Sequence, residues 1–175
     1  MQQEASRKLG VGAATVMLGT LEGVRRPGIA VTLTAAAMRT RRIRISSNII
    51  QLPLYHPVLL AEQLAVLDIL SNGRVDVGIG QGAHPFAMEF RMLGVNPKER
   101  SSRLEEGLEI LLRCWTEEHP FDFHGKHWDL SGVWINPKPL QKPHPPTFVV
   151  APFSAKAMDR VARFGLDVGG WGGFF

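Results

Sequence analysis

Short apolar runs alternate along the chain with longer amphipathic stretches. Four of the short runs are rich in β-branched residues or bounded by glycine, which is typical of buried strands; they lie near residues 43–50, 75–79, 147–151 and 166–170. At least one helical stretch separates each of these runs from the next. This order of elements predicts an α/β fold in which a parallel sheet is covered by outer helices.

The longer stretches have the period and the end signals of helices. They cover residues 29–40, residues 57–73, residues 97–116 and the segment after Ser154. Pro57 suits a first helical position because it lacks an N–H group, and Ser154 is a natural N-cap. Leu60, Leu64, Leu67 and Leu70 fall three to four residues apart and predict one core-facing stripe. A short helix is expected in "HPFAMEFRMLG" and a β-hairpin in "FDFHGKHWDL".

Composition adds the size and class of the protein. With 175 residues, of which 45% are hydrophobic, the chain can form one packed domain. We assign residues 1–28, which show no clear period, to a poorly defined leader and residues 29–175 to that domain. The single cysteine, Cys114, excludes an internal disulfide, favours a cytoplasmic location and is expected to be a small core residue.

Charge and hydropathy argue against two kinds of partner. Much of the net charge of +4 comes from one run, Arg39, Arg41, Arg42 and Arg44, which we interpret as a solvated face at a helix end. No aromatic residues adjoin the run for bases to stack on, so we expect no nucleic-acid partner. No apolar stretch approaches the length of a membrane span, so we expect a soluble protein without a membrane partner.

The candidate chemistry lies in two loops that follow strand ends, "QLPLYHP" and "GQGAHPF". The carboxyl ends of parallel strands share one face, where α/β proteins bind ligands. Gly78, Gly80 and Gly82 could let a flat ring or a phosphate approach the backbone, or could simply permit a tight turn. The pattern is not the dinucleotide fingerprint, because "GIGQGAHP" does not open directly into a helix.

Individual polar residues each allow two interpretations. His56 could act as an acid, a base or a substrate contact, or could hydrogen-bond the first turn of the helix that follows it. Arg100 and Arg103, early in the long helix, could bind a phosphate or be solvated. The histidines lack the spacing and the cysteine partners of a metal site, so we expect no metal.

Several blocks of the sequence together resemble the bacterial luciferase-like flavin monooxygenase family. They are "RIRISSNIIQLPLYHPVLLAEQLAVLDILSNGRVDVGIGQG", "EFRMLGV", "RLEEGLEILLRCWTEE", "NPKPLQKPHPPTFVVA" and "ARFGLDVGGW", and they cover roughly residues 29–171 in unbroken order. The resemblance implies a (β/α)₈ barrel of the TIM type that binds reduced FMN or, in sister enzymes, a deazaflavin coenzyme. Such enzymes use reduced flavin and O₂ to insert one oxygen atom into a small organic substrate, with a flavin reductase as one source of reduced flavin.

The resemblance also implies cofactor-binding roles for particular residues. Asn48 and Ile49 match the point where the backbone bends behind the flavin ring, often at a non-prolyl cis peptide. The other matched residues are Gly80, Gln81 and Gly82 at the strand end that lines the flavin, one of Arg100 and Arg103 at the phosphate, Ser154 in the phosphate loop, and Trp171 at an aromatic wall. No catalytic residue is identified, and His56 is a candidate only.

Two features of the chain depart from the family. No block before residue 29 resembles the histidine-bearing motif that serves the reaction with oxygen, and "GGWGGFF" ends the chain at a strand. A complete barrel takes about 250 residues and eight strands, whereas four strands can be placed here. We therefore expect a partial barrel that forms a homodimer or is completed by another chain. A catalytically inactive flavin-binding or structural remnant of the family is the alternative.

Overall fold

Six strands form one sheet within the part of the chain that the computed structural model describes, residues 15–18, 28–82, 87–150, 154–170 and 173–174. In sheet order they are β1 (Thr15–Leu18), β2 (Arg44–Gln51), β3 (Val75–Gly80), β6 (Thr147–Val150), β7 (Asp167–Gly170) and β8 (Gly173–Phe174). Neighbours from β1 to β7 pair in parallel, and β8 pairs antiparallel with β7. The four predicted strands and their parallel pairing are confirmed.

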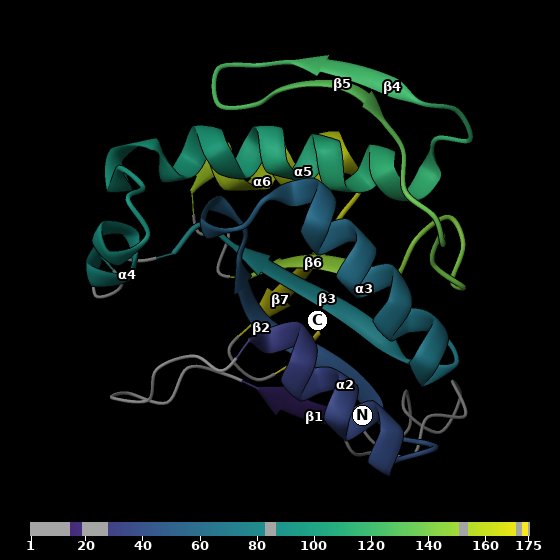
Figure 1. Cartoon of the computed structure of the whole chain (residues 1–175). Coiled ribbons are helices and arrows are strands. Elements are labelled where there is room, and N and C mark those ends of the chain that lie inside the picture. The colour runs from purple at the N-terminus through teal and green to yellow at the C-terminus, as the bar shows by residue number, and fades with distance from the viewer. Residues whose placement is uncertain (1–14, 19–27, 83–86, 151–153, 171–172, 175) are drawn as a thin grey trace.

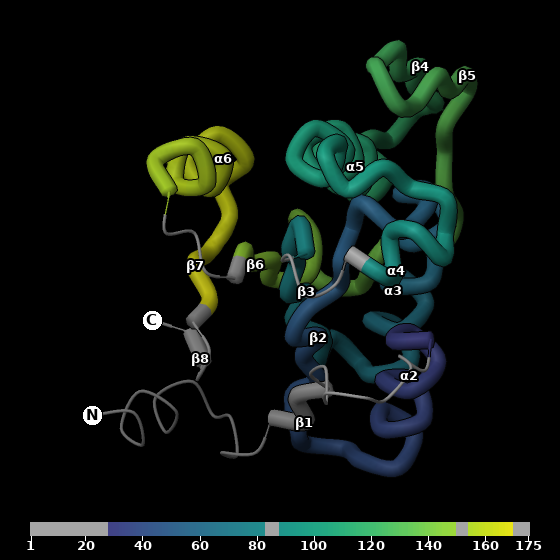
Figure 2. The backbone as a smooth tube through the Cα atoms, turned by 90° about the vertical axis from the view of Figure 1, so that its left-hand side faces the viewer, coloured from purple at the N-terminus to yellow at the C-terminus, as the bar shows by residue number. Residues whose placement is uncertain are grey.

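The main helices pack on the outer face of the sheet. They are α2 (Ile29–Arg39), α3 (Pro57–Ser71), α5 (Arg100–Thr116) and α6 (Ala155–Phe164) (Figure 1). Seen along the strands, the sheet curves through an arc and these helices follow its outside (Figure 2). The predicted α/β class is confirmed, as a partial barrel. Short helical turns lie in the connections: η1 (Leu52–Leu54), α4 (Ala87–Met92) and η3 (Pro97–Glu99).

A separate two-stranded hairpin lies over α5 on its side away from the sheet (Figures 1 and 2). Its strands are β4 (Phe121–His124) and β5 (Asp129–Val133), which confirms the predicted hairpin. The Glu106 carboxylate of α5 fixes the turn by accepting hydrogen bonds from the backbone N–H groups of Lys126 and His127, at 2.9 and 2.8 Å.

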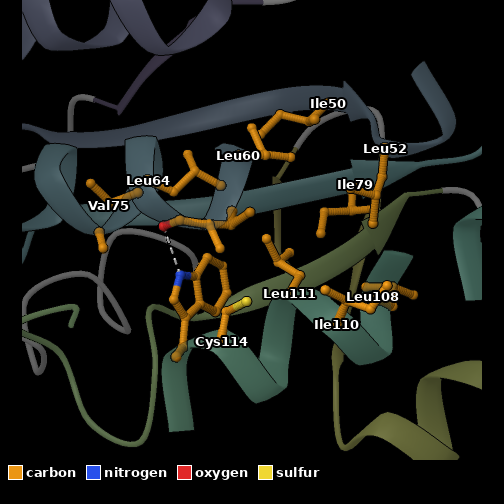
Figure 3. Close-up of a cluster of buried hydrophobic side chains, with 14 of the residues drawn as sticks. Ile50, Leu52, Leu60, Leu64, Val75, Ile79, Leu108, Ile110, Leu111 and Cys114 are labelled. Carbon is orange, nitrogen blue, oxygen red and sulfur yellow. Dashed lines mark hydrogen bonds between the residues drawn. The ribbon is translucent and has the colours of Figure 1, made fainter. Parts of the chain in front are cut away.

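The core lies between the sheet and the helices α3 and α5 (Figure 3). Leu64 from α3, Ile79 from β3 and Leu111 from α5 are each 0% exposed there. The indole N–H of Trp115 donates to the carbonyl of Ala61 at 3.0 Å, which links α5 to α3. Cys114 is buried as expected, and burial raises the pKa of its thiol to about 11, so it is a packing residue rather than a nucleophile.

One predicted core position is wrong. Leu60, Leu64 and Leu67 are buried as the stripe predicts, but Leu70 is 46% exposed. Helix α3 is apolar on most of its circumference, so the hydrophobic spacing alone did not distinguish the buried side from the outer side.

The N-terminal segment that was expected to be a poorly defined leader contains a strand. β1 lies within residues 1–28 and pairs with β2 from Thr15–Arg44 to Leu18–Ser47. The division at residue 28 stays a prediction. No helix in the described part of the chain is both long and apolar enough to cross a lipid bilayer.

Two arginines organise the amino-terminal end of the strands. Arg44 of β2 does not belong to a solvated face, as the arginine run suggested; it forms an ion pair with the buried Asp76 of β3, with Nε 2.7 Å from Oδ2. Arg74, just before β3, donates to backbone carbonyls at the end of α2, at Ile43 and at Ser71. These contacts fix the end of the sheet opposite the carboxyl ends of the strands.

Candidate functional site

The carboxyl ends of β2 and β3 lie side by side, and β2 carries an irregularity there. The Asn48–Ile49 peptide is cis, as the resemblance led us to expect. The strand register shifts between Ser47, which pairs with Val77, and Ile50, which pairs with Ile79. The Ser47 hydroxyl bonds the N–H and the carbonyl of Gly78 within this interval, so hydrogen bonding continues across the shift.

The glycines of β3 have a packing role that the sequence did not reveal. A β carbon on Gly80 would overlap the Cδ1 atom of Ile49, and one on Gly78 would overlap the Ser47 carbonyl and the ring of Phe148. Gly82 has φ of 81°, a conformation that favours glycine, and a β carbon there would press on Phe90. The neighbouring protein atoms therefore already require glycine at this strand end, without any ligand. A role beside a cofactor is compatible with this and stays a prediction.

A pocket of about 270 Å³ opens beside this strand end, between the start of α5 and the start of α6. It is lined by Gln81, Lys98, Arg100, Ser101, Ser154, Lys156, Ala157 and Arg160. The Ser154 hydroxyl caps α6 by accepting from the backbone N–H of Ala157 at 3.2 Å, which confirms the predicted N-cap. Three residues that the sequence indicated for cofactor binding, Gln81, Arg100 and Ser154, thus meet in one pocket.

The pocket has the electrostatics of an anion site. The N-terminal end of a helix carries a partial positive charge, so basic residues there are electrostatically unfavourable. Nevertheless, Lys98 lies in η3 directly before α5, Arg100 is the first residue of α5, and Lys156 lies in the first turn of α6. Cations placed against two helix dipoles are expected where a bound anion offsets their repulsion.

The structure separates the two candidate arginines. Arg100 lines the pocket, whereas Arg103 lies toward the hairpin, with Nε 3.1 Å from Glu99 Oε2 and its guanidinium 6.0 Å from the centroid of the Trp128 ring. Arg100 is therefore the one of the pair that geometry favours for a phosphate.

His56 also lies on the hairpin side. Its ring meets Trp128 edge-on, with centroids 4.8 Å apart, and it is exposed at the start of α3. The expected hydrogen bond from its imidazole to the first turn of α3 is absent; only its backbone carbonyl serves the helix, accepting from Leu60 N–H at 3.0 Å. The pocket lining does not include His56, and its catalytic role stays a prediction.

Sequence reasoning missed Arg160, whose side chain is only 4% exposed. One of its terminal nitrogens donates to Ser101 Oγ at 3.1 Å and to Glu105 Oε1 at 2.8 Å, which joins α6 to α5. Its buried Nε–H has no hydrogen-bond acceptor among the described residues. An unpaired buried donor costs about 1–3 kcal/mol, so the described residues leave one donor of Arg160 unused.

Glu105 holds several of these cations in place. Lys156 Nζ is 3.5 Å and Arg163 Nη2 is 3.9 Å from its carboxylate, in addition to the bond from Arg160. Partial burial acts to raise the pKa of Glu105, but the hydrogen bond and charge of Arg160 and the charges of Lys156 and Arg163 lower it overall. Glu105 is therefore ionised at neutral pH and offsets part of the cationic charge.

Two further expectations concern what the site contains. Trp171, assigned to an aromatic wall, lies outside the described residues. Within the described ranges, no three His, Cys, Asp or Glu side chains come together as metal ligands would.

The chain belongs to the luciferase-like monooxygenase family, whose sequence model matches residues 9–174. It is 31% identical over 125 residues to the oxygenase component of the flavin-dependent trigonelline monooxygenase of Acinetobacter baylyi, a match that covers 71% of this chain and 34% of that protein. It is 35% identical over 122 residues to the FMNH₂-dependent dimethylsulfone monooxygenase of Pseudomonas putida, covering 67% and 32% respectively.

Among solved structures, the monooxygenase RslO1 from Streptomyces bottropensis superposes with a TM-score of 0.80 at 31% identity. That match covers 92% of this chain and 49% of RslO1. The chain thus spans about a third of the length of the two curated relatives and about half of RslO1.

Proposed function

We propose that the protein is a flavin-dependent monooxygenase that uses reduced FMN and O₂ to insert one oxygen atom into a small organic substrate. Membership of the family and the activities of its relatives support the class. The observation that carries the proposal to this chain is the pocket at the starts of α5 and α6, where Gln81, Arg100 and Ser154 meet.

The residues of the pocket fit the phosphate of FMN. Lys98, Arg100 and Lys156 would neutralise its charge, and the Ser154 hydroxyl and the Gln81 amide are suited to hydrogen-bond its oxygens. FMN, when bound, supplies the reaction with O₂ that side chains cannot perform. The protein would contribute binding and orientation, with the backbone of Asn48, Ile49 and Gly80 beside the ring.

Among the described residues, the pocket accounts only for the phosphate end of the cofactor. We propose that a second copy of this chain or another chain completes the barrel, and that a flavin reductase supplies reduced flavin. An incomplete wall lowers affinity because binding depends on a preorganised site. We therefore expect oxidised FMN to bind the isolated chain weakly, with a dissociation constant of about 1 μM or higher.

The test is a calorimetric titration of the 175-residue chain with FMN and with riboflavin, which lacks the phosphate. FMN is expected to bind at least about tenfold more tightly than riboflavin. Arg100→Gln should reduce FMN affinity and leave riboflavin affinity unchanged. Arg103→Gln is the matched control, from the same turn of α5, and should bind both ligands as the wild type does.

Equal affinity of the wild type for FMN and riboflavin would contradict the phosphate assignment. Free reduced FMN consumes O₂ without a protein, so the measurement compares the rate of O₂ consumption with and without a completed barrel. FMN binding that leaves this rate unchanged would favour the inactive alternative. The deazaflavin alternative is tested by the same titration with that coenzyme in place of FMN.

A further inference from the structure

Arg160 has a combination of features that a purely structural ion pair does not require. It lines the pocket, its side chain is 4% exposed, and Glu105 and Ser101 of the neighbouring helix hold its guanidinium. Its Nε–H has no acceptor among the described residues. A fixed guanidinium with an unused donor is prepared to receive an oxygen atom from a ligand.

The number of donors around the pocket indicates which kind of phosphate it suits. Lys98, Arg100 and Lys156 carry charged donors, Ser154 and Gln81 carry neutral ones, and Arg160 adds its Nε–H. A phosphomonoester offers three terminal oxygens and up to two negative charges, so it can satisfy many donors. A phosphate esterified on both sides offers only two such oxygens and one charge.

We infer that Arg160 is the residue that makes the pocket selective for a terminal phosphomonoester over a doubly esterified phosphate or an uncharged flavin. This inference rests on the proposed function, because it assumes that the pocket receives the cofactor phosphate. Glu105 and Ser101 act as positioning residues, which hold the guanidinium beside the pocket while its Nε–H remains available. The selectivity favours FMN over coenzymes in which a further group is attached through the phosphate.

The experiment compares three flavins in the 175-residue chain: FMN, whose phosphate is terminal; FAD, whose flavin phosphate is joined to a second phosphate; and riboflavin, which has none. Calorimetry on the wild type should give the order FMN, then FAD, then riboflavin. In Arg160→Gln, FMN affinity should fall by about tenfold or more while riboflavin affinity stays unchanged, so that the preference for FMN over FAD is lost. Arg163→Gln is the matched control, because Arg163 also approaches Glu105 but does not line the pocket.

Arg160→Lys separates recognition from folding. A lysine keeps the charge facing Glu105 but lacks the planar guanidinium and its Nε–H, so this variant should fold while its preference for FMN over FAD falls. Circular dichroism establishes whether each variant is folded. If Arg160→Gln is not folded, the flavin affinities of Arg160→Lys test the inference instead. Wild-type preference for FMN in both Arg160 variants would overturn the inference and leave the proposed function standing. Absence of any FMN preference in the wild type would overturn both.

Discussion

The Ser47 hydroxyl bonds both backbone groups of Gly78, accepting from its N–H at 2.9 Å and donating to its carbonyl at 3.1 Å. These residues lie where the β2–β3 register shifts, next to the bend at Asn48 and Ile49. A side chain therefore supplies hydrogen bonds that an uninterrupted ladder would supply from the backbone. The Ser47 hydroxyl thus bridges the gap in the β2–β3 pairing, which resumes at Ile50 and Ile79.

Ser47→Ala should lower the free energy of unfolding by about 1–3 kcal/mol, because it leaves buried backbone groups of Gly78 without this partner. Urea denaturation measures the change. Thr116→Ala is the control, since the Thr116 hydroxyl donates to the carbonyl of Leu112 at an exposed position and its loss should cost about 0.5 kcal/mol or less. Equal destabilisation by the two substitutions would show that the Ser47 hydroxyl is not needed.

Gly80 and Ile49 should be energetically coupled. Gly80→Ala places a methyl group where the Cδ1 atom of Ile49 lies, which is expected to cost about 1–3 kcal/mol of overpacking. Ile49→Val removes that atom and by itself costs about 0.5–1.5 kcal/mol. The double variant should be more stable than the sum of the two single changes predicts, and a double-mutant cycle of thermal denaturation measures the difference. Simple additivity would contradict the overlap. The larger Gly80→Leu substitution would disturb this packing whatever its effect on cofactor binding.

The Arg44–Asp76 pair should be costly to break from one side. Arg44→Met leaves the Asp76 carboxylate buried without its cation, which is expected to cost about 3–5 kcal/mol at neutral pH. Replacing both residues, as Arg44→Met with Asp76→Leu, should recover most of that loss. Chemical denaturation of the two variants gives the comparison, and a double variant as unstable as the single one would refute this account.

The stability of the Arg44→Met variant should depend on pH. Burial raises the pKa of Asp76, and the hydrogen bond and charge of Arg44 oppose this rise. Without Arg44 the folded-state pKa rises further above the unfolded value, so the folded protein binds a proton more readily than the unfolded chain does. The deficit of Arg44→Met relative to the wild type should therefore shrink as the pH falls toward about 4. A deficit that does not change with pH would show that Asp76 is not the source.

Glu105 gives a second dependence on pH, which arises from a lowered pKa rather than a raised one. Its folded-state pKa is lowered below the ordinary 4.5, so the stability that it contributes is present above pH 4.5 and is lost as the pH falls through the lowered pKa. The wild type should exceed Glu105→Gln in melting temperature at neutral pH, and the gap should close in acid. Glu109→Gln, on an exposed position of the same helix, should show little gap at either pH. A gap for Glu105→Gln that persists in strong acid would contradict the ion-pair explanation.

Local signals in the sequence were enough to predict much of the fold. Pro57 begins α3 and Ser154 caps α6, as their backbone preferences require, and the β-branched runs form the predicted strands. Contacts between distant residues could not be predicted in this way. Arg160 bonds Glu105 across 55 positions, and Arg44 finds Asp76 only when β2 pairs with β3.

The sequence predicted which residue types form the candidate site, but not which individual residues line the pocket. Arg100 and Arg103 are equivalent by position in the sequence, and only the packing of α5 between α6 and the hairpin directs one to the pocket and the other away. A usable signal was present, however. Lys98, Arg100 and Lys156 lie at two predicted helix starts, where positive charge is electrostatically unfavourable, and this pattern is compatible with a bound anion.

The contacts of Arg74 have a consequence for how sequences of this fold can diverge. Most of its hydrogen bonds are accepted by main-chain oxygens, those of Ala37, Thr40, Ile43 and Ser71. Every amino acid supplies such an oxygen, so the side chains around Arg74 can be exchanged while the junction between α2, β2 and β3 keeps its form. Arg74 itself has no such freedom, because only a guanidinium presents enough donors in one plane. Among related sequences, the residues around Arg74 should therefore vary, whereas Arg74 itself should stay an arginine.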